Sequence, residues 1–354
     1  MYNVTNPPAS VCILRLSAIG DTCHVLPVIR TLQSAWPNTR FSWVIGRLEA
    51  KLFGHLPDIE FFVVDKRAGP WQARNQLKEA LRGRSFDVLM HMQLSLRASL
   101  LSSAIPAKLR LGFDRSRARE LQWLFTNMRI APAARQHVMD SLFGFAEKFD
   151  VYERRLRWDI PLSDAALAYA QRVIPEPGNT LIISPCSSHR LRNWRPEYYA
   201  EIADYAVAAL GMRVILCGGP SEIEQRTGQE IQRRMKQNCV NTIGQDTLLQ
   251  FLATLERATL LITPDSGPAH MGTMAGIPVL GLYAATNPAR SGPYLSRQWC
   301  VDKYDVAARR LMGKPAAELP WTTKIERPGV MDLITPDDVI KKLHALLLSL
   351  ARKR

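Results

Sequence analysis

Short apolar segments alternate with segments of helical period through the first half of the chain. In the first helical segment, apolar side chains recur at Val25, Ile29 and Leu32. The stretch 118–149 is expected to form two further helices. Alternation of strand and helix predicts a parallel sheet. Its strands are expected at 11–16, 41–45, 61–64 and 86–92, with helices ending at Trp36 and spanning 72–82.

The same pattern restarts after a polar, proline-rich passage near 159–178. A chain of 354 residues is also too long for one typical hydrophobic core. We therefore predict an α/β protein with two doubly wound, Rossmann-like domains that share one cleft at the carboxyl ends of their sheets. The predicted bounds are 1–165 and 166–334, followed by a helix at 335–354 that can pack back on the first domain. Strands of the second domain are expected at 181–184, 213–216, 240–242, 259–263 and 279–282.

The charge balance is strongly basic. Lys and Arg number 46 against 32 Asp and Glu, which gives a net charge of +14. Such a surface attracts nucleic acid, anionic lipid or phosphorylated sugars. Basic residues are densest over 110–135, where Arg115, Arg117 and Arg119 are the candidate anion ligands and a solvated helix face is the alternative. No nucleic-acid-binding motif accompanies the charge, so we expect no nucleic-acid partner.

The cysteine and histidine residues show no metal-ligand spacing. The six cysteines lie far apart without a C-x-x-C pair, which predicts buried thiols in a reducing compartment and no metal site. The N-terminal residues lack the basic start and uninterrupted apolar run of a signal peptide, and no apolar stretch reaches 18 residues. We expect a cytoplasmic protein whose membrane contact, if any, is peripheral.

Missing motifs narrow the chemistry. No G-x-G-x-x-G or G-x-x-x-x-G-K-[ST] occurs, so a dinucleotide site of the Rossmann type and a P-loop are both disfavoured. No D-x-D pair is present to hold a divalent ion on a diphosphate. Any diphosphate must therefore be neutralised by the protein itself.

Two strand ends of the second half offer such a site. The turn at 264–270 runs from a strand into a helix, and backbone N–H groups at a helix start bind anions. The loop at 184–194 adds hydroxyls and arginines that can replace a metal's charge. An ordinary capped turn is the structural alternative. The candidates are Ser187, Ser188 and Arg192 in the loop and Asp265, Ser266, Gly267 and His270 in the turn.

A carboxylate follows the first strand of the chain. Asp21 ends the small-residue loop 15–21 just before the first helix. It is either a catalytic acid or base, or a helix N-cap, or a charge that the helix dipole stabilises. In the second half, Glu222 follows another tight strand-end turn and could accept a ribose hydroxyl.

Taken together, the motifs at 16–21 and 264–270 resemble the two signatures of glycosyltransferase family 9, the heptosyltransferases of lipopolysaccharide core assembly. Gln93 and the short motifs between the signatures follow the family's order, so the resemblance spans nearly the whole chain. These motifs are 112–114, 118–120, 194–196, 218–220 and 283–288.

The resemblance implies a GT-B fold, an ADP-heptose donor on the C-terminal domain, an acceptor on the N-terminal domain and inversion at the anomeric carbon. An inverting displacement requires a general base, and we predict that Asp21, at the end of the first strand's loop, is this base. The resemblance implies no cofactor. The family's usual Lys and Thr-Gly are Arg192 and Ser266-Gly267 here, and its Thr-Asp-Pro is Thr286-Asn287-Pro288, without the carboxylate. The implied donor contacts are Asp265 to the heptose, Ser187, Ser188, Arg192, Ser266 and Gly267 to the diphosphate, Glu222 to the ribose and Asp246-Thr247 to adenine, with His270 in the same motif.

The expected acceptor is a phosphorylated or Kdo-bearing lipid A, held by Arg115, Arg117 and Arg119. A monomer in peripheral contact with the anionic inner membrane, on its cytoplasmic face, would meet this acceptor. Two alternatives stay open: a GT-B transferase or epimerase that uses another nucleotide-sugar, and a non-catalytic nucleotide-sugar-binding partner in envelope assembly. The acid at Asp21 argues against the silent partner.

Overall fold

The computed structural model describes residues 2–352, and it separates into two compact units, Met1–Pro161 (unit 1) and Leu162–Arg354 (unit 2). The division lies close to the predicted boundary after residue 165. Lys353 and Arg354, at the end of the predicted final helix, lie outside the described residues. Among residues 2–352, no helix has the length and apolar character needed to cross a bilayer.

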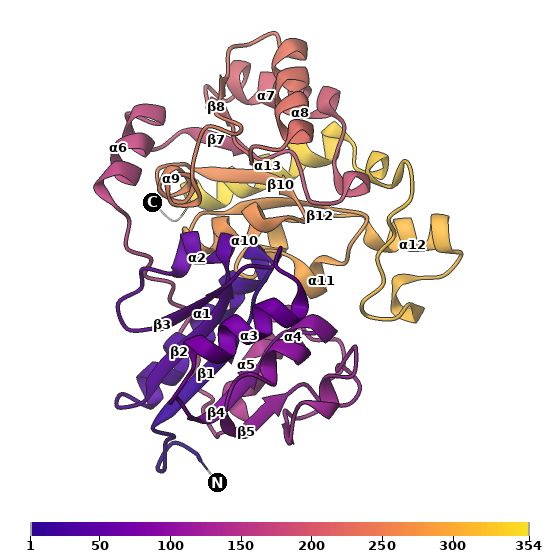
Figure 1. Ribbon diagram of the computed structural model, residues 1–354. Helices are drawn as coiled ribbons and strands as arrows, with labels where there is room; N and C mark the ends of the chain where they lie inside the picture. The colour runs from indigo at the N-terminus through magenta and orange to yellow at the C-terminus, as the bar shows by residue number, and fades with distance from the viewer. Residues whose placement is uncertain (1, 353–354) are drawn as a thin grey trace. The chain divides into compact units, whose positions relative to one another are not determined.

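Unit 1 contains a parallel sheet of six strands in the order β3-β2-β1-β4-β5-β6 (Figure 1). The order reverses direction between β1 and β4, and ligands bind at such a switch point in doubly wound folds. The strands are β1 (Ser10–Leu14), β2 (Arg40–Gly46), β3 (Glu60–Val64), β4 (Phe86–His91), β5 (Ala107–Gly112) and β6 (Met128–Arg129). The helices are α1 (Ile19–Ala35), α2 (Arg47–Phe53), α3 (Pro70–Ala80), α4 (Leu96–Ser102) and α5 (Val138–Glu147).

Helices cover both faces of this sheet. Cys12 and Leu14 on one face of β1 pack in a cluster with α3 and α4. Alternate strand residues point to opposite faces, so Val11 and Ile13 face the other layer, where α1 lies beside α5. Because both faces are buried, β1 and β4 are apolar almost throughout, which explains why the sequence revealed them.

The expectation of two helices over 118–149 was wrong for its first part. That part forms a 3₁₀ turn, η1 (Gln122–Leu124), and then β6; only α5 is a helix. Glu120 and Leu121 have φ values of 46° and 62°, a left-handed conformation that cannot continue a right-handed helix. The buried side chain of Gln122 anchors the turn instead.

Unit 2 repeats the architecture with the strand order β12-β11-β10-β7-β8-β9, again parallel, and its switch point lies between β7 and β10. The strands are β7 (Thr180–Ile183), β8 (Arg213–Leu216), β9 (Val240–Asn241), β10 (Leu260–Pro264), β11 (Val279–Tyr283) and β12 (Val301–Asp302). The helices are α6 (Asp164–Val173), α7 (Pro196–Ala208), α8 (Glu222–Arg234), α9 (Leu248–Glu256), α10 (Gly267–Met274), α11 (Pro288–Ser291), α12 (Tyr304–Met312) and α13 (Pro336–Ala351). Further 3₁₀ turns include η2 (Arg190–Arg192) and η5 (Val330–Leu333).

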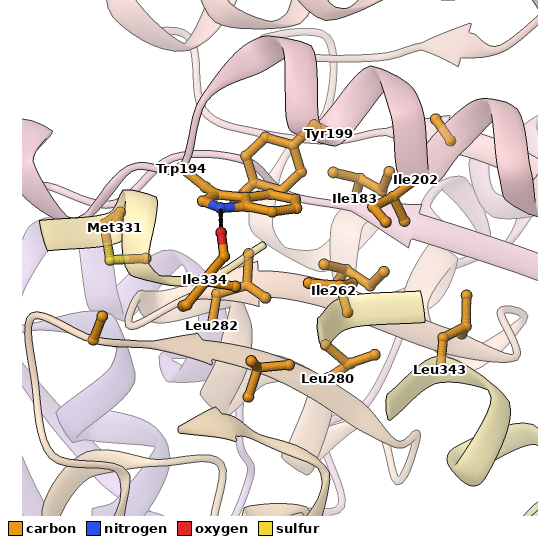
Figure 2. Packing of buried hydrophobic residues seen from close by; sticks show 14 of the residues in the cluster. Ile183, Trp194, Tyr199, Ile202, Ile262, Leu280, Leu282, Met331, Ile334 and Leu343 are labelled. Atoms are coloured by element: carbon orange, nitrogen blue, oxygen red, sulfur yellow. Dashed lines mark hydrogen bonds between the residues drawn. The ribbon is translucent and has the colours of Figure 1, made fainter. Parts of the chain in front are cut away.

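The core of unit 2 includes the C-terminal helix. Trp194 packs edge-on against Tyr199 at 5.0 Å and donates its indole N–H to the carbonyl of Ile334 at 2.9 Å (Figure 2). One face of α13, with Val339 and Leu343, is buried in the same cluster. The apolar face of α13 thus belongs to the core of unit 2, beside α7. Packing of this helix on the first domain stays a prediction.

Candidate active-site residues

Asp21 lies in the first turn of α1, after the carboxyl end of β1. The N-cap of α1 is Ala18, and Asp21 is the third helical residue, so the N-cap interpretation was wrong. Its carboxylate accepts a long hydrogen bond of 3.4 Å from the backbone N–H of Ala18. It also pairs with Arg15 at 2.6 Å and keeps 38% of its side chain exposed. The carboxylate is thus held in place and accessible.

Arg15, which the sequence analysis did not single out, lies against Asp21. Its side chain is only 10% exposed. Besides pairing with Asp21, it donates to the carbonyls of Met92 at 2.6 Å and Ser17 at 2.8 Å. The buried guanidinium donates several hydrogen bonds, which restrict its motion and hold its pair with Asp21 in place.

Two glutamines connect the Asp21 loop with the basic stretch. The side-chain oxygen of Gln93 accepts from the N–H groups of Leu16 at 2.8 Å and Ser17 at 3.3 Å. Gln122 is fully buried and donates to the carbonyls of His91 at 2.9 Å and Gln93 at 3.2 Å. Burial lowers the pKa of His91 to about 3, so this imidazole is neutral at physiological pH. The loops after β1, β4 and β5 are therefore linked by uncharged groups.

The three candidate acceptor arginines differ in what they contact. Arg117 is largely buried, pairs with Asp114 and donates to Gln136, Ser141 and Ala131. These bonds occupy most of its donors within unit 1 and give it a structural role there, while its part in anion binding stays a prediction. Arg115 lies over the ring of Trp123 at 4.5 Å. Arg115 and Arg119 are exposed and remain candidates.

In unit 2, the loop after β7 is a compact turn. The N–H of Ser187 donates to Asn193 at 2.7 Å, and its hydroxyl donates to the carbonyl of His189 at 3.0 Å. Ser188 is exposed beside it. The turn ends in η2, which carries Arg192 towards the carboxyl end of β10.

Arg192 and Asp265 were both predicted at strand ends, and the structure brings them together. The Nη1 atom of Arg192 lies 3.4 Å from Asp265 Oδ2. A third residue, Glu326, was missed: its Oε1 accepts from both Nε and Nη2 of Arg192, at 2.8 and 2.6 Å. His189 lies 3.6 Å from the other oxygen of Glu326. One guanidinium thus lies between two carboxylates.

The helix α10 starts directly after Asp265. Ser266 occupies the N-cap position, but its hydroxyl makes no capping bond and instead contacts the Thr263 hydroxyl at 2.9 Å. At the start of α10, the N–H of Gly267 receives no side-chain cap and can bind an anion together with the positive end of the helix dipole. Pro268 has no N–H, and the N–H of Ala269 donates to the Ser266 carbonyl at 3.2 Å. His270 is buried within α10.

The predicted nucleoside contacts are less closely grouped. Glu222 is exposed at the start of α8 and pairs with Arg226 at 2.5 Å, whereas Glu224 folds back to accept from the Gly219 N–H at 2.8 Å. Burial raises the pKa of Asp246 to about 7, and its Oδ2 has no hydrogen-bond partner. Thr247 caps α9 through the N–H of Gln250. Thr247 thus has a structural role whether or not it contacts a ligand.

Across residues 2–352, no group of three or more His, Cys, Asp or Glu side chains is arranged to hold a metal ion. Arg192 and the positive end of the α10 dipole both lie near strand ends of unit 2. This arrangement can bind a diphosphate through the start of α10 and one guanidinium.

Residues 74–321 match the profile of glycosyltransferase family 9 (heptosyltransferase). The chain belongs to this family. The lipopolysaccharide core heptosyltransferase OpsX of Haemophilus influenzae is 38% identical over 342 residues, which cover 97% of this chain and 98% of that protein.

Solved members of the family share the fold. The heptosyltransferase WaaC of E. coli with ADP has a TM-score of 0.72 at 19% identity and covers 95% of this chain and 99% of its own. The same enzyme with ADP-2-deoxy-2-fluoro heptose has a TM-score of 0.65 at 20% identity and covers 82% and 97%. The predicted family, the fold of two doubly wound sheets and the assignment as a glycosyltransferase are confirmed.

Proposed function

We propose that this family 9 glycosyltransferase moves heptose from ADP-heptose to the Kdo region of a lipid A acceptor in lipopolysaccharide core assembly. The observation that carries the proposal is the combination of Arg192, Asp265 and the uncapped start of α10 at the switch point of unit 2. The names of the relatives support it, because OpsX is a lipopolysaccharide core heptosyltransferase and WaaC is solved with ADP and with an ADP-heptose analogue.

Donor binding in this proposal uses no metal and no cofactor. The start of α10 and Arg192 stabilise the negative charge that grows on the diphosphate as the bond to the anomeric carbon breaks. Ser187 and Ser188 contribute hydroxyl donors, and Asp265 accepts from heptose hydroxyls. Glu222 and Asp246 are assigned to the ribose and the adenine.

The transfer step is an inverting displacement. The acceptor hydroxyl attacks the anomeric carbon from the face opposite ADP, a new C–O bond forms, and ADP leaves with the electron pair of the broken bond. Asp21 accepts the proton of the attacking hydroxyl. Asp21 suits this role because its carboxylate is partly exposed and is held in place by the ion pair with Arg15.

The acceptor side of the proposal involves Arg115 and Arg119. Exposed arginines bind phosphates or Kdo carboxylates and are attracted to an anionic membrane surface. We place the enzyme as a monomer in the cytoplasm, in peripheral contact with the inner membrane.

Mass spectrometry of products tests this function. The protein is incubated with ADP-heptose and, separately, with other nucleotide-sugars, on lipid A acceptors that carry Kdo, phospho-Kdo or Kdo with one heptose. The expected product gains one heptose on a Kdo-bearing acceptor. Transfer from another donor only, epimerisation of the free nucleotide-sugar, or binding without turnover would each contradict the proposal.

A further inference from the structure

Glu326 holds one edge of the Arg192 guanidinium, although the two residues are 134 positions apart. Both bonds, from Nε and from Nη2, go to the single oxygen Oε1. The opposite edge carries Nη1, whose contact with Asp265 is longer, at 3.4 Å. The two side chains are 14% and 23% exposed, so solvent competes little for these bonds.

Glu326 is itself held by its neighbour in the chain. Ile325 is buried in the core of unit 2 at 1% exposure, and its N–H donates to the carbonyl of Ala285 at 2.7 Å. Ala285 lies just beyond the carboxyl end of β11. The backbone next to Glu326 is therefore fixed relative to the strand ends, and this places the carboxylate within reach of Arg192.

We propose that Glu326 is a positioning residue for the donor: it holds Arg192 by the Nε and Nη2 edge so that the Nη1 edge is presented to the diphosphate. The inference deepens the proposed function and rests on it. Arginine has many rotamers, so holding the side chain in advance reduces the entropy lost when the donor binds. The guanidinium can serve two partners on two edges, which a lysine ammonium cannot do in a defined geometry. Glu326 lies beyond the region that matches the family profile, which ends at residue 321.

A competing role for Glu326 has the opposite consequence. A carboxylate near a diphosphate site could repel the ligand and compete for Arg192. The observed contacts favour positioning, because Glu326 leaves the Nη1 edge to the longer contact with Asp265. Removing Glu326 should therefore weaken donor binding, whereas removal of a competitor would strengthen it.

The test is calorimetric binding of ADP to the full chain and to two variants. In Glu326→Ala, which removes the acceptor, the Kd for ADP should rise roughly tenfold. In Glu326→Gln, the Kd should stay within about threefold, because one amide oxygen can accept both N–H groups that now share Oε1. ADP binding by Glu326→Ala that equals or exceeds the wild type would overturn the inference.

Asp332 provides a matched structural control. It accepts from Nε and Nη2 of Arg195 at 2.6 and 2.5 Å, a second arginine–carboxylate pair between nearby segments of unit 2. Asp332→Ala should leave ADP affinity unchanged. Equal loss in Asp332→Ala and Glu326→Ala would mean that the effect is a general loosening of these segments, and the inference would fail.

A double-mutant cycle separates positioning from direct contact. If Glu326 acts through Arg192, then Glu326→Ala should add nothing to the loss already caused by Arg192→Ala. A further loss in the Arg192→Ala background would overturn the positioning role. Wild-type protein that fails to bind ADP would overturn the proposed function together with this inference, whereas wild-type binding with an unaffected Glu326→Ala overturns the inference alone.

Discussion

Each unit holds an arginine against at least one carboxylate near a switch point, but the number of carboxylates and their exposure differ. In unit 1, Arg15 is 10% exposed and Asp21 is 38% exposed. In unit 2, Arg192 is 14% exposed and its partners Asp265 and Glu326 are 12% and 23% exposed. In unit 1 the ion pair therefore leaves its carboxylate accessible to solvent. In unit 2 two carboxylates lie around one guanidinium, and all three groups are largely buried.

This difference matches the chemistry proposed for each unit. A general base must be reached by the acceptor, so its carboxylate is accessible while the cation supports it. A diphosphate ligand must be met by positive charge, yet Arg192 is already balanced by two carboxylates. The Gly267 N–H and the positive end of the α10 dipole therefore have to supply much of the anion binding in unit 2.

The largest expected effect is on the carboxylate of unit 1. Asp21→Asn should lower kcat by roughly 10²–10⁴-fold, because the amide cannot accept the acceptor's proton. Stability should fall by about 1 kcal/mol or less, since the amide oxygen can still accept the helix N–H. ADP affinity should not change. Steady-state kinetics, thermal melts and ADP calorimetry measure the three quantities.

A matched control for this variant exists in the same unit. Asp140 also lies in the first turn of a helix, α5, and pairs with Arg154 at 2.6 Å. Asp140→Asn should have a similar effect on stability and none on kcat. If the kcat of Asp21→Asn were within a few-fold of the wild-type value, Asp21 would be a structural residue of α1. The difference in exposure between the two units would then have no bearing on catalysis.

The next effect separates two neighbouring arginines of unit 1. Arg117→Ala should lower the free energy of unfolding by roughly 3 kcal/mol, because it leaves the buried Asp114 without its cation. Arg119→Ala should leave stability unchanged and raise the acceptor KM roughly fivefold, the effect of one exposed cation near an anionic surface. Denaturant melts and acceptor kinetics distinguish them. A large loss of ADP affinity in Arg119→Ala would assign this residue to the donor.

A smaller effect concerns the arginine that supports Asp21. Arg15→Gln should lower kcat roughly tenfold through misplacement of the carboxylate. Arg15→Lys should recover part of this loss, because the ammonium can still pair with Asp21. Steady-state kinetics of both variants measure the effect. A kcat of Arg15→Gln equal to that of the wild type would reduce Arg15 to a structural residue.

Much of the fold could be predicted because buried parallel strands are continuous apolar runs. The strand β5 was missed because Lys108 and Arg110 interrupt its apolar residues, and the donors of Arg110 are used by backbone carbonyls such as that of Ser102. Glu120 and Leu121, before η1, are left-handed but are not glycine, so nothing in the sequence indicated this conformation. Local sequence thus failed where side-chain contacts from distant segments determine the backbone.

The candidate site shows the same limit. Asp265 directly follows β10, Asp21 lies in the first turn of α1 and Arg192 lies in the loop after β7, so the sequence could indicate these candidates. The residues that hold these candidates in place could not be predicted in this way. Glu326 is 134 residues from Arg192 and follows no strand. Arg15 lies close to Asp21 in sequence, but its bond to Met92 depends on the pairing of β1 with β4. The sequence also could not show that Arg119 is exposed whereas Arg117 is largely buried, because this difference depends on tertiary contacts.

The smallest expected effect is that of removing divalent ions, and it tests how unit 2 neutralises the diphosphate. Excess EDTA should leave the initial rate of heptose transfer unchanged, because the start of α10 and Arg192 replace the metal. The control is Arg192→Ala, whose residual rate should also be insensitive to EDTA but should respond more strongly to added magnesium, which can take over the missing charge. Loss of wild-type activity in EDTA that magnesium or manganese restores would mean that a metal ion shares this task, and the start of α10 with Arg192 would then be insufficient for the diphosphate.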